Sequence, residues 1–460
     1  MSCVLREAHG VADLLALAAA WPQRYPCLLE SAAQASAAQN AALARYDVLF
    51  ACSGEALTLG SDGRVRDAKG RDRGERFLEA LDADWRAQSV VPDIKVDSQS
   101  LPFRGGWVLF LGYELGAEIE AHLQRMADSG LTLPVAMALR CPAAIVVDRH
   151  TGKTWLVAET ECANWLDTMQ ADLAAVSTFA PEPIAHAQID EDDPQLFLDG
   201  VARIHEYLRA GDVFQVNLSR AWRARFAEPP PPAALYASLR AANPAPFAGL
   251  LQWNGWAIAS SSPERLVEVH GERVQTRPIA GTRPRFADDD DALRMRELAG
   301  HPKERAEHIM LIDLQRNDLG RISVPGSVVV DELMGVESYA HVHHIVSNVR
   351  GRLRAGVTPA QVIRAVFPGG TITGAPKVRT MQIITELEGC ARGAYTGALG
   401  YLNRDGDMDL NILIRTMHMH GSEVRFRAGA GIVADSIALR ELEETRAKAR
   451  GLLRALGASA

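Results

Sequence analysis

Two segments of the sequence each place two glutamates three residues apart in a run that favours a helix. Glu304 and Glu307 form one pair, and Glu441 and Glu444 form the other. Residues at positions i and i+3 lie on one helical face, about 5–6 Å apart. Two such helices facing each other would present four carboxylates to one hard cation, and oxygen ligands of this kind suit Mg²⁺. For either segment alone, the alternative is a solvated helix face.

Several glycine- and proline-rich segments accompany these glutamates, and ordinary core packing does not require them. Together with shorter polar motifs they closely resemble the chorismate-utilising enzymes, a family that contains anthranilate synthase component I, aminodeoxychorismate synthase component I, isochorismate synthases and salicylate synthases. The matching segments are Ser262–Arg265, Arg277–Arg285, Asp313–Arg321, Phe367–Lys377, Ile414–Thr416 and Ala428–Ser436. The resemblance is dense from about Phe197 to Leu453 and thinner before it.

The resemblance implies a magnesium ion and a general acid acting on chorismate, which carries a ring carboxylate and a hydroxyl that leaves poorly. Glu307 and Glu444 match residues at the metal, and Glu304 and Glu441 match residues beside it or acting through water. The Mg²⁺ would neutralise the ring carboxylate and orient the ring. Glu264 matches the acid that protonates the departing hydroxyl. Such a carboxyl needs a raised pKa, which burial or neighbouring carboxylates supply.

The resemblance also implies residues that line the substrate site. His344 matches an active-site histidine near the ring face, where proton transfer or electrostatic support is expected. Without the resemblance, a histidine in an apolar strand would be structural, and Arg415 would be an ordinary strand cation. Gly281, Thr282 and Thr371 match positions in the ring pocket, Arg415, Tyr395 and the backbone of Gly429, Ala430 and Gly431 match positions at the enolpyruvyl carboxylate, and Lys448 lies one helical turn beyond Glu444.

The nucleophile is indicated by Gln215, which stands where isochorismate and salicylate synthases carry a lysine. A lysine with a lowered pKa deprotonates water, whereas a glutamine cannot act as a base. Gln215 therefore favours ammonia as the nucleophile. The sequence shows no glutaminase nucleophile motif around any cysteine, so ammonia is expected from a separate glutamine amidotransferase subunit or from solution.

Two ammonia-using reactions remain within the family. Aminodeoxychorismate synthase component I aminates C4 and keeps the enolpyruvyl group, and Asn217, Gly369–Gly374 and Met408–Ile412 resemble it. Anthranilate synthase component I aminates C2 and eliminates pyruvate. Ala280 favours this alternative, because many aminodeoxychorismate synthases carry a lysine there that adds covalently to C2. We predict C4 amination, in the para-aminobenzoate and folate branch, with C2 amination as the alternative and a non-catalytic scaffold for the amidotransferase as a third hypothesis.

Two further segments resemble those that form the tryptophan pocket of anthranilate synthases. The candidate residues are Leu29, Glu30 and Ser31 in the first segment and Pro244, Pro246 and Phe247 in the second. The structural alternative is a strand end and a turn. Because Ala245 and Phe247 differ from the residues usual at these positions in anthranilate synthases, we predict that tryptophan inhibits weakly or not at all.

Composition fits a cytoplasmic enzyme. The chain has 460 residues, 47% of them hydrophobic, with a net charge of −8 and a pI near 5.9. These values and the absence of a basic stripe argue against nucleic-acid or membrane-surface partners. The six cysteines form no CxxC pair, which is typical of reduced thiols. No run of about 18 apolar residues occurs, so no membrane span is predicted.

The elements that must position these residues follow from periodicity and turn signals. Apolar runs at Tyr46–Phe50, Ala144–Val147, Val213–Arg223 and Ala257–Ser260 predict strands, and Gly74–Gln88, Ala163–Ala175 and Gln195–Ala210 predict helices. The polar stretch Ala180–Pro194 separates an N-terminal region, 1–185, from a chorismate-binding region, 195–455. The mixture predicts an α/β (α+β) protein. The resemblance implies a large two-part antiparallel β-sheet sandwich with surrounding helices, whose regions pack as one intertwined unit.

Overall fold

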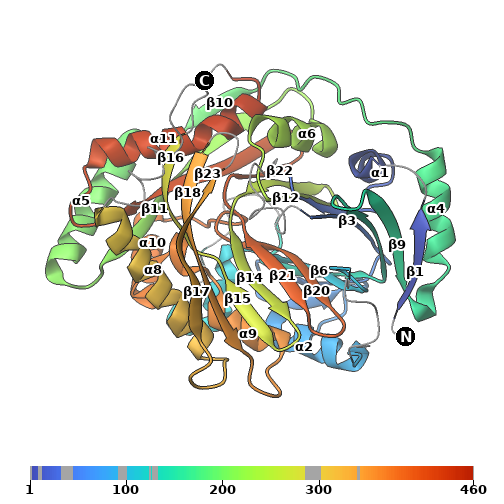
Figure 1. The fold of residues 1–460 in the computed structure, drawn as a ribbon. Helices are drawn as coiled ribbons and strands as arrows, with labels where there is room; N and C mark the ends of the chain where they lie inside the picture. The colour runs from blue at the N-terminus through green and yellow to red at the C-terminus, as the bar shows by residue number, and fades with distance from the viewer. Residues whose placement is uncertain are drawn as a thin grey trace.

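The computed structural model describes residues 3–8, 13–32, 45–91, 101–123, 126, 133–284, 302–338 and 342–458. Within these ranges only the backbone is described at 280–284, 302–304, 338, 342 and 343. Two large sheets dominate the chain (Figure 1), and every strand pair seen in them is antiparallel.

In the described ranges, sheet 1 contains twelve strands. In spatial order they are β1 (Cys3–Ala8), β9 (Lys153–Glu159), β8 (Ala143–Asp148), β3 (Tyr46–Ala51), β2 (Cys27–Glu30), β12 (Phe247–Trp253), β13 (Trp256–Ser262), β22 (Thr416–His420), β23 (Glu423–Ile432), β11 (Gln215–Arg225) and β10 (Gln188–Glu191), with β19 (Gly374–Ala375) beside β11.

Sheet 2 contains eleven strands among the residues that the structure describes. In spatial order they are β16 (Ile279–Pro284), β18 (Val342–Arg352), β15 (Arg273–Thr276), β14 (Arg265–His270), β21 (Met408–Ile412), β20 (Ala398–Asn403), β6 (Gly106–Leu111), β7 (Ala136–Cys141), β4 (Ala56–Leu59) and β5 (Val65–Asp67), with β17 (Val329–Ser338) beside β18. Strands far apart in the sequence are neighbours in each sheet, since β2 pairs with β12 and β6 pairs with β20.

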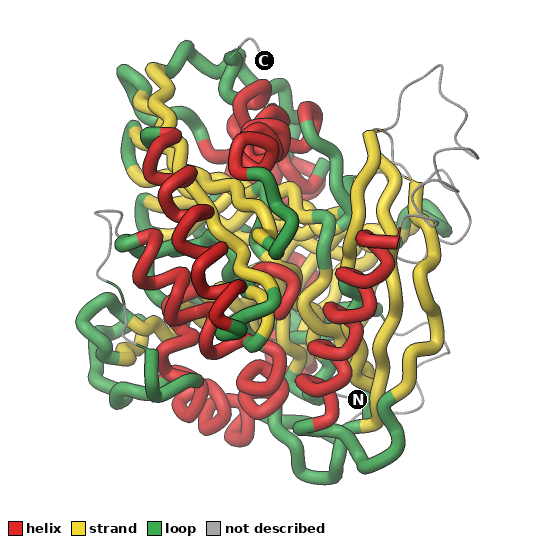
Figure 2. The backbone as a smooth tube through the Cα atoms, turned by 90° about the vertical axis from the view of Figure 1, so that its left-hand side faces the viewer, coloured by secondary structure: helices red, strands yellow, loops and turns green. Residues whose placement is uncertain are grey.

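Helices lie outside the sheets (Figures 1 and 2). They are α1 (Leu14–Ala20), α2 (Phe77–Gln88), α3 (Gly116–Ile119), α4 (Trp165–Ala175), α5 (Pro194–Ala210), α6 (Pro232–Ala242), α8 (Pro302–Gly320), α9 (Pro359–Val366), α10 (Lys377–Glu388) and α11 (Ala438–Ala455), with short 3₁₀ turns η1 (Tyr113–Leu115), η2 (Thr160–Cys162) and η3 (Gly370–Ile372). In the described part of the chain, no helix is long and apolar enough to cross a membrane.

The core has an inner and an outer part. Between the sheets, Phe50 of β3 and Ile258 of β13 pack in one cluster with Phe110 of β6 and Leu139 of β7. Outside sheet 1, a second cluster includes residues of α1, α6 and α11, and outside sheet 2 a third includes residues of α2, α8 and α9. Burial of both sheet faces explains why β6 and β7 are apolar along their whole length rather than alternating. The predicted α/β (α+β) fold with two antiparallel sheets is confirmed.

Local signals fixed some helix ends well and others poorly. Helix α5 begins one residue before its predicted start, because Asp193 accepts a hydrogen bond from the Gln195 amide at 2.9 Å, and it ends at Gly211, whose φ is +78°. Helix α2 begins at Phe77, three residues later than predicted. Its first amide, on Phe77, donates to the Glu118 carboxylate at 2.7 Å, a cap supplied by a distant segment.

Candidate active site

Glu264 is a buried carboxyl at the junction of the two sheets. It follows β13, and its carbonyl accepts a hydrogen bond from the Ile412 amide at 3.0 Å, which ties it to the end of β21. Its own amide donates to the Ser262 hydroxyl at 3.2 Å. Burial raises the pKa of Glu264 to about 7, and the Thr371 hydroxyl, the Ile279 amide and the charge of Arg415 oppose that rise. Near neutral pH the carboxyl can therefore carry and donate a proton.

Arg415 faces this carboxyl from the segment between β21 and β22. Its φ of +52° is unusual for a residue with a Cβ, and its carbonyl accepts from the Ser261 amide at 3.1 Å. Burial lowers the pKa of Arg415, whereas the Glu264 charge raises it. Within the described ranges its guanidinium makes no hydrogen bond. A half-buried guanidinium whose donors bind no group in the described part of the chain is suited to a carboxylate ligand.

Two glycines of β23 allow side chains to approach the strand closely. A Cβ on Gly429 would lie 2.7 Å from Asn217 Oδ1 and 2.8 Å from the Tyr395 hydroxyl oxygen, and a Cβ on Gly431 would lie 2.6 Å from Gln215 Nε2. No side chain fits at either position without moving these groups. Burial raises the pKa of Tyr395 to about 12, so its hydroxyl remains a donor.

Lys448 closes this side of the site from helix α11. Its ammonium donates to the Gly429 carbonyl at 2.9 Å and pairs with Glu444 at 2.7 Å. The structure thus brings Gln215, Tyr395, Gly429, Gly431 and Lys448 together. Ala430 points to the opposite face of β23, where it packs in a buried cluster with residues of α5 and α10.

A comparison with known families agrees with this arrangement. The sequence profile of the chorismate-binding enzymes matches residues 32–454, which is most of the chain. The chain belongs to this family. It is a chorismate-utilising enzyme.

The relatives of this chorismate-binding enzyme include proteins named aminodeoxychorismate synthase and proteins named anthranilate synthase. Aminodeoxychorismate synthase component 1 of Bacillus subtilis is 41% identical over 369 residues, covering 77% of each chain. Anthranilate synthase component 1 of Streptomyces coelicolor is 41% identical over 381 residues, covering 77% of this chain and 73% of the relative. The crystal structure of anthranilate synthase component I from Streptococcus pneumoniae superposes with a TM-score of 0.79 at 32% identity, covering 89% of this chain and 92% of that one. Equal identities do not distinguish the two reactions.

The predicted metal carboxylates lie on the two expected helices. Glu304 and Glu307 belong to α8, and Glu441 and Glu444 belong to α11. The side chain of Glu304 lies outside the described residues. Among the side chains that are described, no group of three or more histidine, cysteine, aspartate or glutamate residues converges as a metal site would require. The four-carboxylate site therefore stays a prediction.

Strands β16 and β18 carry the remaining ring-pocket residues. His344 of β18 is buried and lies opposite Thr282 of β16 in the register, and the register shifts between Ala280 and Thr282 around Gly281. Such a bulge changes the direction of the side chains that follow, and bulges are common beside active sites. The side chains of Ala280 and Thr282 lie outside the described residues. The sequence indicated Asn217 only as a residue that resembles aminodeoxychorismate synthases. In the structure its side chain lies against Gly429, so Asn217 belongs to the same wall of the site as Tyr395.

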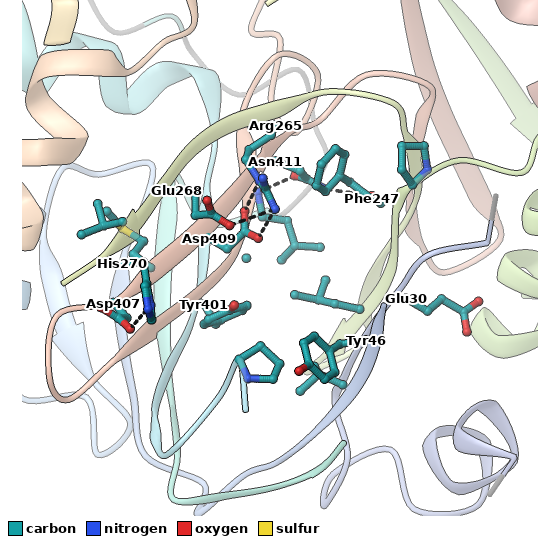
Figure 3. Close-up of a pocket in the computed structure, with 18 of the residues that line it drawn as sticks. Glu30, Tyr46, Phe247, Arg265, Glu268, His270, Tyr401, Asp407, Asp409 and Asn411 are labelled. Carbon is teal, nitrogen blue, oxygen red and sulfur yellow. Dashed lines mark hydrogen bonds and ion pairs between the residues drawn. The ribbon is translucent and has the colours of Figure 1, made fainter. Parts of the chain in front are cut away.

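A separate cavity of about 260 Å³ contains part of the predicted tryptophan pocket (Figure 3). Leu29, Glu30, Pro246 and Phe247 line it, whereas Ser31 and Pro244 are not among its lining residues. The Glu30 carboxylate points away from the centre of the cavity, as Figure 3 shows. It accepts hydrogen bonds from Tyr236 at 2.7 Å and Arg240 at 2.9 Å, so its charge is already neutralised.

The cavity also holds a charged pair that an amino-acid side chain would meet. The Arg265 guanidinium binds Asp409 through two hydrogen bonds of 2.9 and 2.8 Å and lies 5.0 Å from the centre of the Phe247 ring. A bidentate pair of this kind is costly to displace because each charge would be left buried without its partner. The pairing of Arg265 with Asp409 therefore supports the prediction that tryptophan inhibits weakly or not at all.

We therefore expect chorismate consumption to be unchanged by millimolar tryptophan. The physical reason is that Glu30 and Arg265 already have internal partners, so neither is free to bind the amino acid. Initial rates at a chorismate concentration near KM, with phenylalanine as a control for nonspecific effects, measure this. Strong inhibition by tryptophan alone would contradict the prediction and favour the anthranilate synthase alternative.

Proposed function

We propose that this enzyme is aminodeoxychorismate synthase component I, which transfers ammonia to C4 of chorismate. The observation that supports an ammonia user is the Gln215 side chain, whose amide lies against Gly431 in the wall of the site. A neutral amide donates and accepts hydrogen bonds but does not remove a proton from water. Its role in the proposal is to orient ammonia.

The ammonia is proposed to come from a separate glutamine amidotransferase subunit. The sequence carries no glutaminase motif, and the named relatives include component 1 of aminodeoxychorismate synthase. C4 amination is favoured by the motifs around Asn217, Gly369–Gly374 and Met408–Ile412. It is also favoured by the internal pairing of Glu30 and Arg265 at the predicted tryptophan pocket. Anthranilate synthase component I is the second candidate because Ala280 replaces the lysine expected for C4 amination.

In the proposed reaction, Glu264 is the general acid. Hydroxide is a poor leaving group, so loss of the C4 hydroxyl requires a proton donor in the transition state. Glu264 holds its proton because it is buried, and Arg415 beside it limits how far the pKa rises. Arg415 and the Tyr395 hydroxyl bind the enolpyruvyl carboxylate, which fixes the ring so that its hydroxyl lies at Glu264.

C4 amination without a lysine at position 280 needs two displacements. In the first, ammonia or water adds at C2 of the diene while the C4 hydroxyl leaves with the proton of Glu264. The nucleophile that has added at C2 then gives up one proton, which returns to the Glu264 carboxylate. In the second displacement, ammonia adds at C4 while the group at C2 leaves with that proton of Glu264, and the new ammonium at C4 returns a proton to Glu264, so the net reaction releases one water. Alanine at 280 forms no covalent adduct, so this route replaces the lysine adduct.

The Mg²⁺ proposed for this enzyme fits the residues present. The carboxylates of α8 and α11 offer oxygen donors in pairs one helical turn apart, which is the chemistry that Mg²⁺ prefers. Glu307 and Glu444 would hold it, with Glu304 and Glu441 beside them. When bound, it would neutralise the ring carboxylate and withdraw electron density from the ring. Lys448 would then keep its contact with the Gly429 carbonyl.

A product assay tests the proposed function. Purified protein with chorismate, Mg²⁺ and ammonium is expected to yield para-aminobenzoate only when an aminodeoxychorismate lyase is added. Chromatography separates para-aminobenzoate from ortho-aminobenzoate, and Glu264→Gln is the negative control. Ortho-aminobenzoate without the lyase would overturn the assignment and establish anthranilate synthesis.

The general-acid role predicts a pH profile. Since the protonated form of Glu264 is the active one, kcat is expected to fall as pH rises through about 7 when the concentration of unprotonated ammonia is held constant. Glu264→Gln is expected to lose about 10²- to 10⁴-fold in kcat and to lose that descending limb. A Gln variant that keeps the limb would assign the titration to another group.

The metal proposal predicts that Glu307→Gln and Glu444→Gln abolish turnover without unfolding the protein. Removing one carboxylate weakens Mg²⁺ binding, so magnesium titration by calorimetry is expected to show a large loss of affinity. Circular dichroism checks the fold. The matched control is Glu443→Gln, on the adjacent exposed position of α11, whose one ion pair among the described residues is with Arg446 on the surface. Full activity in either test variant would refute the metal assignment.

A further inference from the structure

Arg392 is a fully buried arginine behind the wall of the substrate site, and its side chain does not face the substrate groups described above. It is 2% exposed. All five of its N–H donors are used. Nε and Nη2 bind the two carboxylate oxygens of Glu388 at 3.0 and 2.6 Å, Nη2 also donates to the Asn217 carbonyl at 2.8 Å, and Nη1 donates to the Ile372 carbonyl and the Thr396 hydroxyl, both at 3.3 Å.

Two tyrosine rings fix the plane of this guanidinium. Its central carbon lies 4.8 Å from the centre of the Tyr113 ring and 5.5 Å from that of the Tyr395 ring. Cations attract aromatic faces most strongly where water is excluded, as it is here. The Tyr395 ring therefore packs directly on Arg392, while its hydroxyl lies above Gly429 on the substrate side.

The charge of Arg392 is balanced by Glu388, which is itself held from several sides. The Glu388 carboxylate also accepts from Arg427 at 3.0 Å and from the Ser219 hydroxyl at 2.8 Å. Burial by itself would raise the pKa of Glu388, but the charges of Arg392 and Arg427 lower it below the usual value. The carboxylate is ionised across the working pH range, so the Arg392 guanidinium is held permanently.

The hydrogen bonds of Arg392 connect both groups of site residues. Asn217 belongs to β11, where its side chain lies against Gly429, and Ile372 follows Thr371, which lies beside Glu264. Thr396 follows Tyr395 and has a φ of +62°, a backbone conformation that needs support from its surroundings. One side chain therefore joins the turn beside the proposed acid to the wall that carries Tyr395.

We propose that Arg392 is a positioning residue that holds the Tyr395 hydroxyl above Gly429 and so sets the carboxylate-binding geometry before substrate enters. This rests on the proposed role of Tyr395 in binding the enolpyruvyl carboxylate. Arg392 itself does not touch the substrate. Lysine cannot replace it, because a single ammonium has no planar fork to bind both oxygens of Glu388 while reaching two carbonyls and stacking between two rings. Binding geometry set by such a fixed side chain is lost by small displacements.

A double-mutant cycle tests the proposal, using Arg392→Lys, Tyr395→Phe and the double variant. Steady-state chorismate consumption gives kcat and KM, and it does not depend on which carbon is aminated. Arg392→Lys is expected to raise KM for chorismate about tenfold, the cost of losing one hydrogen bond to a charged group. In the Tyr395→Phe background the same substitution is expected to add less than about twofold, because its effect passes through the Tyr395 hydroxyl.

Arg140→Lys is the matched control for loss of a buried guanidinium. Arg140 is 8% exposed, binds Glu159 at 2.5 Å and the Gly106 carbonyl at 3.1 Å, and lies 5.1 Å from the centre of the Trp107 ring, but it is in sheet 2 away from Tyr395. Both lysine variants are expected to melt at lower temperature. Only Arg392→Lys is expected to change KM.

Two results would overturn the positioning role. One is a KM effect of Arg392→Lys that multiplies fully with that of Tyr395→Phe, and the other is an equal KM change in Arg140→Lys. If Arg392→Lys does not fold, Glu388→Gln replaces it in the cycle, since it frees the same guanidinium while keeping the shape of the side chain. A wild-type protein that consumes no chorismate would instead refute the proposed function, so the two failures are distinguishable.

Discussion

The wall of the substrate site depends on the ion pairs and hydrogen bonds of one buried carboxylate, that of Glu388. A carboxylate removed from water is costly unless its oxygens are fully hydrogen-bonded, and here two guanidinium groups together with the amide and hydroxyl of Ser219 bind them. These partners come from β11, the loop after α10, and β23. Removing one partner of such a pair costs about 3–5 kcal/mol because the other charge stays buried. The contacts of Glu388 therefore determine how β11, the loop after α10 and β23 pack against one another.

Close packing on the glycines of β23 is the second constraint on the site. Tyr395, Asn217 and Gln215 all approach the strand at distances that exclude a Cβ at Gly429 or Gly431. The strand beneath these side chains is a firm support because it is paired along ten residues with β11. Gln215 and Asn217 thus face the site from a strand, and Tyr395 faces it from the turn before β20, which favours a fixed geometry.

The sequence predicted the residues whose types are unusual for their position. A glutamate after Ser-Pro and two glycines inside a strand have no role in an ordinary core, so Glu264, Gly429 and Gly431 could be found by resemblance. Arg392 was missed because an arginine in a Gly-containing turn normally lies at the surface. Its burial depends on carbonyls and a carboxylate from segments far away in the chain, and no local pattern encodes them.

Strands and helices were predicted by periodicity, but strand order was not, since alternation says nothing about which strands are neighbours. The helix bearing Glu304 and Glu307 was likewise predicted, whereas its distance from α11 depends on tertiary packing, which no local pattern encodes.

The interleaving of early and late strands has a consequence for how the chain folds during synthesis. The Arg104 amide binds the Asn403 side chain at 2.9 Å across 299 residues of sequence, at the place where β6 meets β20. Until β20 leaves the ribosome, β6 lacks one neighbour, and until β12 does, β2 lacks one, so their unpaired backbone groups are open to pairing with other chains. Strand pairs between residues far apart in the sequence form slowly, because the entropy cost of closing the long loop comes before the free-energy gain from pairing. A nascent chain of this enzyme is therefore an expected client of chaperones that shield exposed strand edges.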